Sequence, residues 1–234
     1  MMRLLSAFRT TYQRLVPFAI RNSVLARKLK SRLLPHDELY NSDYFATTVE
    51  LPARDSAGPM AESIVSDLAP RTVVDVGCGT GALLEQLRNR GCDVFGLEYS
   101  EAGLRYCRDR RLNVRKFNLE RDVYDESNSF DVAISIEVAE HLPEKAADRY
   151  VDLLARLSAT IVFTAAPPGQ GGLDHVNEQA PSYWVSKFRN RGFKHDAELS
   201  DRWREKWRET GVAEMYCKNL MIFRRTPKSI QLPT

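Results

Sequence analysis

The chain has 234 residues, of which 43% are hydrophobic, and a formal net charge of +3, a size and composition that suit one sizeable α/β domain with short appendages. No apolar run approaches the roughly 20 residues that span a bilayer, and the N-terminus lacks a compact hydrophobic core followed by a cleavage site. The four cysteines are widely spaced and form no CxxC pair, so neither a zinc knuckle nor a disulfide framework is indicated. We therefore expect a soluble, cytoplasmic protein.

The first 36 residues form a separate basic segment. They contain eight Lys or Arg residues and no acid, which leaves a net charge of −5 on the remaining chain when these eight are subtracted from +3. Apolar residues recur within it at helical spacing until Pro17 interrupts the pattern. Such a segment can lie on an anionic membrane through residues 1–34, or touch nucleic acid. A solvated helix packed on the domain, a frayed leader and an organelle leader are the alternatives.

From residue 37 to residue 234 we predict one catalytic domain. Short runs rich in Val, Ile and Phe alternate with longer runs of helical periodicity. The expected strands are residues 72–77, 92–98, 112–118, 130–137 and 159–166, and the expected helices are 81–91, 100–111, 143–157 and 180–193. This order predicts a Rossmann-like, doubly wound, mostly parallel α/β sheet. Residues 214–225 are expected to close it as a hairpin or strand pair, antiparallel to the rest.

A glycine-rich loop follows the first expected strand. Gly77, Gly79 and Gly81 bring backbone N–H groups close to a ligand at the start of a helix. With Ala82 they also satisfy the GxGxxA form of the dinucleotide fingerprint, so the glycines alone leave NAD open. Asp75 favours a ligand with a cationic amino-acid tail, because a carboxylate there would oppose a pyrophosphate. A recognisable Ser/Tyr/Lys or His/Asp redox set, which an NAD-dependent oxidoreductase would use, is also missing from the sequence.

The stretch VVDVGCGTG resembles the first motif of the class I S-adenosylmethionine-dependent methyltransferases, and the resemblance extends from about residue 40 to residue 225. It implies the fold of that family and S-adenosylmethionine as cofactor. Glu98 lies 21 residues after Gly77, where an acid accepts hydrogen bonds from ribose hydroxyls. Asn118 and Leu119 occupy the place where the family has an Asp for the adenine amino group. The cofactor-binding residues that the resemblance implies are Asp75, Gly77, Cys78, Gly79, Gly81, Glu98, Tyr99, Asn118, Leu119 and Glu137.

A second group of chemically active residues follows the fourth expected strand. Glu137, Glu140 and His141 have i, i+3, i+4 spacing, and His175 follows the glycine-rich loop 167–172 from the same edge of the sheet. We predict that these four residues converge as ligands of Mg²⁺ or Mn²⁺, with His141 and His175 as the catalytic candidates. A metal-free general base at His141 is one alternative. In the other, Glu140 caps the helix and His141 hydrogen-bonds locally.

This ExxEH arrangement is similar to the metal sites of the ubiquinone-biosynthesis O-methyltransferases and the small-RNA 3′-terminal 2′-O-methyltransferases, whose acceptors present two vicinal oxygens. The resemblance implies O-methylation, and we predict a sugar, a glycan precursor or another small vicinal diol as acceptor. RNA or a quinone precursor, N- or C-methylation, and an inactive scaffold that binds S-adenosylmethionine are the alternatives. Nucleic acid ranks lower because the catalytic body is net acidic. No sequence feature specifies an oligomeric state.

Aromatic residues supply two further predictions. One group can stack on an acceptor or belong to the core, with Trp203 and Trp207 at the spacing of a core-facing helical stripe. A second group, within LYNSDYF, is expected to form part of a lid over the cofactor, as similar segments do in the family. The first group is Tyr183, Trp184, Trp203 and Trp207, and the second is Tyr40, Tyr44 and Phe45.

Overall fold

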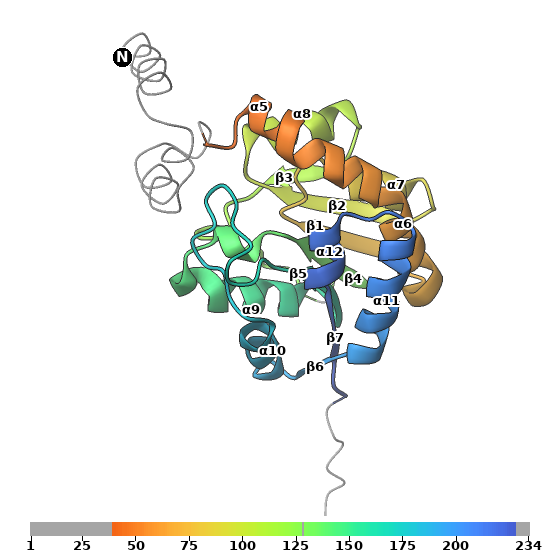
Figure 1. Cartoon of the computed structure of the whole chain (residues 1–234), viewed down its shortest axis with the longest axis vertical. Helices are drawn as coiled ribbons and strands as arrows, with labels where there is room; N and C mark the ends of the chain where they lie inside the picture. Colours follow the sequence, from red (N-terminus) through yellow and green to blue (C-terminus); the bar gives the residue numbers. More distant parts are fainter. Residues whose placement is uncertain (1–38, 128, 228–234) are drawn as a thin grey trace, which may run out of the picture.

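A computed structural model describes residues 39–127 and 129–227 of the chain (Figure 1). Seven strands form one sheet with the order β3-β2-β1-β4-β5-β7-β6. β7 runs antiparallel to both of its neighbours, and the other pairs are parallel. The strands are Thr72–Val76 (β1), Asp93–Glu98 (β2), Val114–Lys116 (β3), Val132–Ile136 (β4), Thr160–Thr164 (β5), Phe193–His195 (β6) and Met221–Arg225 (β7). The predicted doubly wound sheet with an antiparallel C-terminal strand is confirmed.

The helices begin and end where local sequence signals change. Ser100 caps the start of α8, its side chain accepting a hydrogen bond from the backbone N–H of Ala102. α10 has Pro181 as its first residue, where the missing N–H costs nothing. The helices are Ser42–Tyr44 (α5), Phe45–Val49 (η1), Glu50–Leu68 (α6), Ala82–Arg88 (α7), Glu101–Asp109 (α8), Ala139–His141 (η2), Glu144–Ala146 (η3), Ala147–Leu157 (α9), Pro181–Arg189 (α10), Ala197–Glu209 (α11) and Glu214–Asn219 (α12).

Helices cover both faces of the sheet. Figure 1 shows α9 and α10 on one side of the sheet and α6, α7 and α11 on the other. Successive strand residues point to opposite faces, so Val74 and Ala133 pack in the cluster with α9 and α10, whereas Val73 and Ile134 pack in the cluster with α6, α7 and α11. Both faces of the central strands are therefore buried, which explains their nearly continuous apolar sequences.

The expected hairpin at residues 214–225 is wrong in its first half. The structure has α12 followed by β7, and β7 pairs with the short β6. Tyr216 and Cys217 are adjacent and both buried in the same apolar cluster. Neighbouring residues of a strand would face opposite sides, so a helical turn satisfies this pattern better.

The aromatic group predicted near the acceptor lies mostly in the core. Trp184, Trp203 and Trp207 are each at most 1% exposed. The indole N–H of Trp203 donates to Asp67, and that of Trp207 donates to Ser63 Oγ at 3.1 Å. These three tryptophans therefore stabilise the packing of helices on the sheet and cannot stack on an acceptor.

The basic segment, residues 1–36, and its predicted membrane contact lie outside the described residues. Across residues 39–127 and 129–227, no helix has the length and apolar character that are needed to cross a membrane.

Replacing Ile134 tests the two-faced core. This fully buried side chain lies in the centre of β4, so we expect Ile134→Ala to lower the free energy of unfolding by about 2 to 5 kcal/mol. Val123→Ala is the control, because Val123 is 61% exposed, and we expect a change below about 0.5 kcal/mol. Urea denaturation measures both values. Equal midpoints for the two variants would contradict the assigned core.

Candidate active site

Two carboxylates lie at the carboxyl edge of the sheet, at the ends of neighbouring strands. Asp75 is the penultimate residue of β1, and Glu98 ends β2. Glu98 accepts hydrogen bonds from the backbone N–H groups of Gly79 at 2.8 Å, Tyr99 at 2.8 Å and Ser100 at 2.7 Å. Oδ1 of Asp75 is buried without a hydrogen-bond partner among the described residues. Asp75 thus precedes the glycine loop, and Glu98 is hydrogen-bonded to it.

Burial sets the electrostatics of this pair. It raises the pKa of Asp75 to about 8, and the charge of Glu98 adds to the rise. Burial also raises the pKa of Glu98 to about 7, although its three backbone hydrogen bonds oppose the shift. Two buried acids without a cation beside them are costly when ionised, so the site favours a positively charged ligand.

The glycine loop itself is shaped by close contacts. Gly81 has a φ of 75°, and a Cβ built there would lie 2.4 Å from Cδ1 of Leu112. The left-handed backbone favours glycine here, and any side chain would also displace Leu112. The N–H groups of Gly77 and Cys78 donate to the carbonyl of Leu97 at 2.7 and 3.1 Å, which fixes the loop to β2.

The other residues predicted to bind the cofactor have identifiable partners. Cys78 Sγ lies 3.9 Å from Cys107 Sγ, and this hydrogen bond together with burial raises the pKa of Cys78. Asn118 organises the turn after β3, its Oδ1 accepting from the N–H of Glu120 at 2.9 Å. Leu119 packs against the core, and Tyr99 lies beside Lys116. Their contacts with a cofactor stay predictions.

The segment from Leu39 to Val49 lies over the glycine loop. The carbonyl of Tyr40 accepts a hydrogen bond from Ser100 Oγ at 3.0 Å, and Phe45 packs in a small apolar cluster with Ala102 of α8. A Cβ built on Gly79 would lie 3.4 Å from Cγ1 of Val49. The predicted lid segment therefore lies beside the glycine loop, and its cover over a cofactor stays a prediction.

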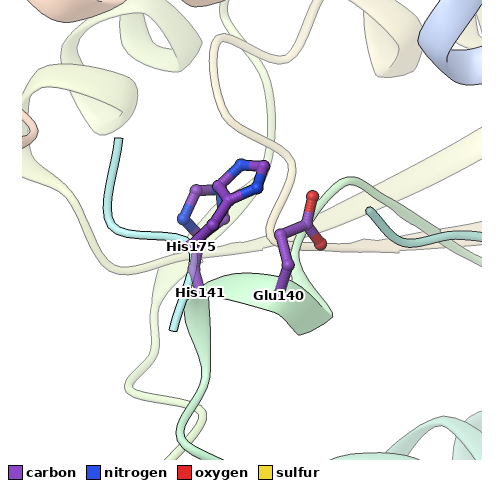
Figure 2. Close-up of side chains that lie close together, drawn as sticks. All are labelled: Glu140, His141 and His175. Atoms are coloured by element: carbon purple, nitrogen blue, oxygen red, sulfur yellow. The ribbon is translucent and has the colours of Figure 1, made fainter. Parts of the chain in front are cut away.

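Three of the four predicted metal ligands lie together. One ligand atom each from Glu140, His141 and His175 falls within 4.8 Å of the other two, and Figure 2 shows the two imidazoles beside the Glu140 carboxylate. The histidine rings meet edge to face with centroids 4.9 Å apart. Both carboxylate oxygens of Glu140 are buried without a hydrogen-bond partner among the described residues. Burial and the nearby charge of Glu137 raise the pKa of Glu140.

The loop that carries His175 is held against Glu140. The N–H groups of Val176 and Asn177 donate to the Glu140 carbonyl at 2.9 and 3.0 Å. Nδ1 of His175 lies 2.9 Å from Oε1 of Glu178. A Cβ built on Gly172 would lie 2.1 Å from Nε2 of His175, so a side chain at residue 172 would displace the imidazole. Residues 172–178 thus position His175 from several sides.

Glu137 has a different environment. Its backbone is left-handed with a φ of 52°, an uncommon conformation that often marks functional sites. Its carboxylate accepts hydrogen bonds from Gln170 Nε2 at 2.7 Å and Asn219 Nδ2 at 3.0 Å. Glu137 thus joins the end of β4 to the loop 167–172 and to α12. It lies outside the group formed by Glu140, His141 and His175.

Several site residues carry no recognisable signal in the sequence. Tyr216 of α12 is buried, which raises its pKa, and Glu137 is the largest of the nearby charges that raise it further. Asn219 and Tyr216 fall in the segment predicted as a hairpin, which hid their proximity to the site. The other residues that sequence reasoning left unassigned are Gln170, Asp174 and Glu178.

The residues present suit two positively charged groups. The buried pair Asp75 and Glu98 suits the cationic amino-acid part of S-adenosylmethionine, and Oδ1 of Asp75 and Oγ1 of Thr80 have no hydrogen-bond partner in the described part of the chain. One carboxylate and two imidazoles form a donor set that Mn²⁺ accepts, and Mg²⁺ binds such a site through carboxylate and water oxygens. Both groups would reduce the cost of the buried negative charge.

Comparison with known proteins finds related sequences. Residues 73–160 match the family described as methyltransferase domain. The ubiquinone biosynthesis O-methyltransferase of Pseudomonas paraeruginosa is 32% identical over 122 residues, which cover 50% of this chain and 49% of that protein. The chain thus spans about half the length of this curated relative.

Two solved structures share the fold. Magnesium protoporphyrin IX methyltransferase from Synechocystis, with bound S-adenosylmethionine, gives a TM-score of 0.55 at 17% identity and covers 83% of this chain and 99% of that one. The sugar N-methyltransferase KedS8 from Streptoalloteichus gives 0.58 at 12% identity, with coverages of 79% and 92%. The match over residues 73–160 and the shared fold make this chain similar to the class I S-adenosylmethionine-dependent methyltransferases.

The carboxylate pair predicts a pH dependence of cofactor binding. The ammonium group of S-adenosylhomocysteine is attracted by ionised acids, so we expect the affinity for this ligand to rise about tenfold between pH 6 and pH 8, with Asp75→Asn weakening binding and flattening the profile. Isothermal titration calorimetry measures the affinities, and NAD in the same experiment should produce no binding heat. An affinity that falls with pH would contradict the assignment.

The same pKa shifts predict the opposite trend for ligand-free stability. Because both pKa values are raised on folding, the stabilising contribution of these acids is present below their ordinary pKa values of 3.8 and 4.5. It is lost as the pH rises through about 7 for Glu98 and about 8 for Asp75.

Proposed function

We propose that this protein is an O-methyltransferase that moves the methyl group of S-adenosylmethionine to a hydroxyl of a sugar, a glycan precursor or another small vicinal diol. The observation that supports it is the group formed by Glu140, His141 and His175 at the same sheet edge as the cofactor pair. We further propose that this group holds Mg²⁺ or Mn²⁺, with Glu137 as a fourth candidate.

The chain's own residues divide the work between binding and orientation. Asp75 and Glu98 hold the cofactor, which supplies the methyl group to be attacked. Glu140, His141 and His175 hold the cation, which when bound would chelate two neighbouring oxygens and lower the pKa of the attacking hydroxyl. The buried scaffold around Glu140 fixes the approach of the acceptor, so that positioning contributes much of the rate.

A quinone precursor is the second candidate acceptor. The curated relatives are named ubiquinone biosynthesis O-methyltransferases, and a catechol offers the same pair of vicinal oxygens as a sugar diol. Nucleic acid ranks lower because the chain beyond residue 36 has a net charge of −5 when the eight basic residues of the first segment are subtracted from +3.

Metal removal tests the first part of the proposal. We expect chelation to abolish methyl transfer from labelled S-adenosylmethionine and Mg²⁺ or Mn²⁺ to restore it. Glu140→Gln and His175→Ala should each reduce metal-restored kcat by more than about 100-fold, since loss of a ligand costs more than loss of an outer hydrogen bond. Glu144→Ala is the control, because Glu144 is exposed on η3.

Activity that is unchanged by chelation and by His175→Ala would overturn the proposal that the site holds a metal ion. If such activity still fell in His141→Gln, a metal-free base at His141 would replace it.

Paired substrates test the acceptor class. We expect a sugar diol or a catechol to be methylated at least about tenfold faster than its analogue with a single hydroxyl, because only the pair can chelate the cation. Product mass and the rate of S-adenosylhomocysteine release provide the measurement. Equal rates for both members of each pair would show that vicinal oxygens are not required.

A further inference from the structure

A hydrogen-bonded chain runs from His141 to a carboxylate through a tyrosine. Nδ1 of His141 lies 2.9 Å from the hydroxyl oxygen of Tyr40, and that hydroxyl donates to Oδ2 of Asp174 at 3.1 Å. The three residues come from distant parts of the sequence, with 101 positions between Tyr40 and His141 and 134 between Tyr40 and Asp174. These two hydrogen bonds join the segment around Tyr40 to the two segments that supply His141 and His175.

Proton counting determines which nitrogen of His141 carries the hydrogen. An ionised carboxylate only accepts hydrogen bonds, so the single hydroxyl proton of Tyr40 is directed to Asp174. The contact between Tyr40 and Nδ1 then requires the imidazole to donate its own Nδ1 proton. The lone pair of His141 is consequently on Nε2.

His175 reaches the same state by a shorter route. Its Nδ1 lies 2.9 Å from Glu178, whose carboxylate also accepts from the N–H groups of Gly169 and Gly171 at 2.8 and 2.7 Å. Both imidazoles thus orient Nδ1 toward a carboxylate, directly or through Tyr40. Metal-binding histidines are commonly fixed in this way, with the second nitrogen donating to a carboxylate.

Tyr40 is itself held firmly. It is 9% exposed, its ring meets those of Tyr44 and His141 edge to face, and its carbonyl accepts from Ser100 Oγ at 3.0 Å. Ser100 donates its backbone N–H to Glu98, the acid predicted to bind the ribose. The position of the Tyr40 hydroxyl beside His141 therefore depends on the hydrogen bonds that hold this segment to the end of β2.

We infer that Tyr40 and Asp174 are positioning residues that hold His141 in the Nδ1–H tautomer, which places the lone pair of the imidazole on Nε2. The inference deepens the proposed function and rests on it for the role of the lone pair. The tautomer itself can be measured without metal, cofactor or turnover.

Nitrogen-15 NMR of the full, metal-free chain at pH 8 tests the inference directly. Long-range correlations between the ring protons and nitrogens distinguish the tautomers, and His141→Gln and His175→Gln assign the signals among four histidines. In the wild-type protein we expect Nδ1–H for both His141 and His175. In Tyr40→Phe, which keeps the ring contacts, we expect His141 to shift toward Nε2–H while His175 stays unchanged.

Tyr44→Phe is the matched control, since it removes a hydroxyl from the neighbouring ring of the same segment and should leave both tautomers unchanged. A second variant, Asp174→Asn, keeps a side chain that tolerates the left-handed φ of 59° and should shift His141 partially. Wild-type His141 in the Nε2–H form, or a His141 signal unaffected by Tyr40→Phe, would overturn the relay.

Manganese titration separates this inference from the proposed function. If the Tyr40 hydroxyl fixes the tautomer of a metal-binding His141, we expect Tyr40→Phe to weaken Mn²⁺ binding by about 10- to 100-fold. The expected tautomers without Mn²⁺ binding by the wild type would support the relay and contradict the metal. Mn²⁺-dependent turnover with His141 in the Nε2–H form would support the metal site and contradict the relay.

Discussion

Buried negative charge at one edge of the sheet is the constraint on which the site depends. Asp75, Glu98 and Glu140 are each at most 9% exposed, and burial raises the pKa of all three. No Lys or Arg within residues 39–127 and 129–227 forms an ion pair with them. Removing an unpaired charge from water costs several kcal/mol, so these acids favour cationic ligands. A cofactor with an ammonium and a sulfonium group, and a divalent metal, meet that requirement.

The parallel register explains how residues far apart in sequence share this edge. Val73 of β1 pairs with Val132 of β4, and Ala133 of β4 pairs with Ile161 of β5, so the loops after these strands leave the sheet side by side. The first loop carries the glycines, and the others carry Glu140 and His175. One sheet edge thus brings the glycine loop beside the group formed by Glu140, His141 and His175.

Sequence reasoning succeeded where the signal was local or followed from the sheet edge. The strands, the positions of Asp75 and Glu98, and the convergence of Glu140, His141 and His175 are of this kind. It failed for α12, where six residues with apolar neighbours fit a strand as well as a helix. It also left the partners of Glu137 and the link from Tyr40 to Asp174 unassigned, because these contacts depend on packing between distant segments.

A crystal structure with S-adenosylhomocysteine and Mn²⁺ tests the central claim most directly. Anomalous scattering should locate manganese among Glu140, His141 and His175, with the nucleoside between the glycine loop and Glu98. A bound nucleoside without manganese in that group, at saturating Mn²⁺, would contradict metal-assisted transfer. A nucleoside bound elsewhere would contradict the role assigned to Asp75 and Glu98.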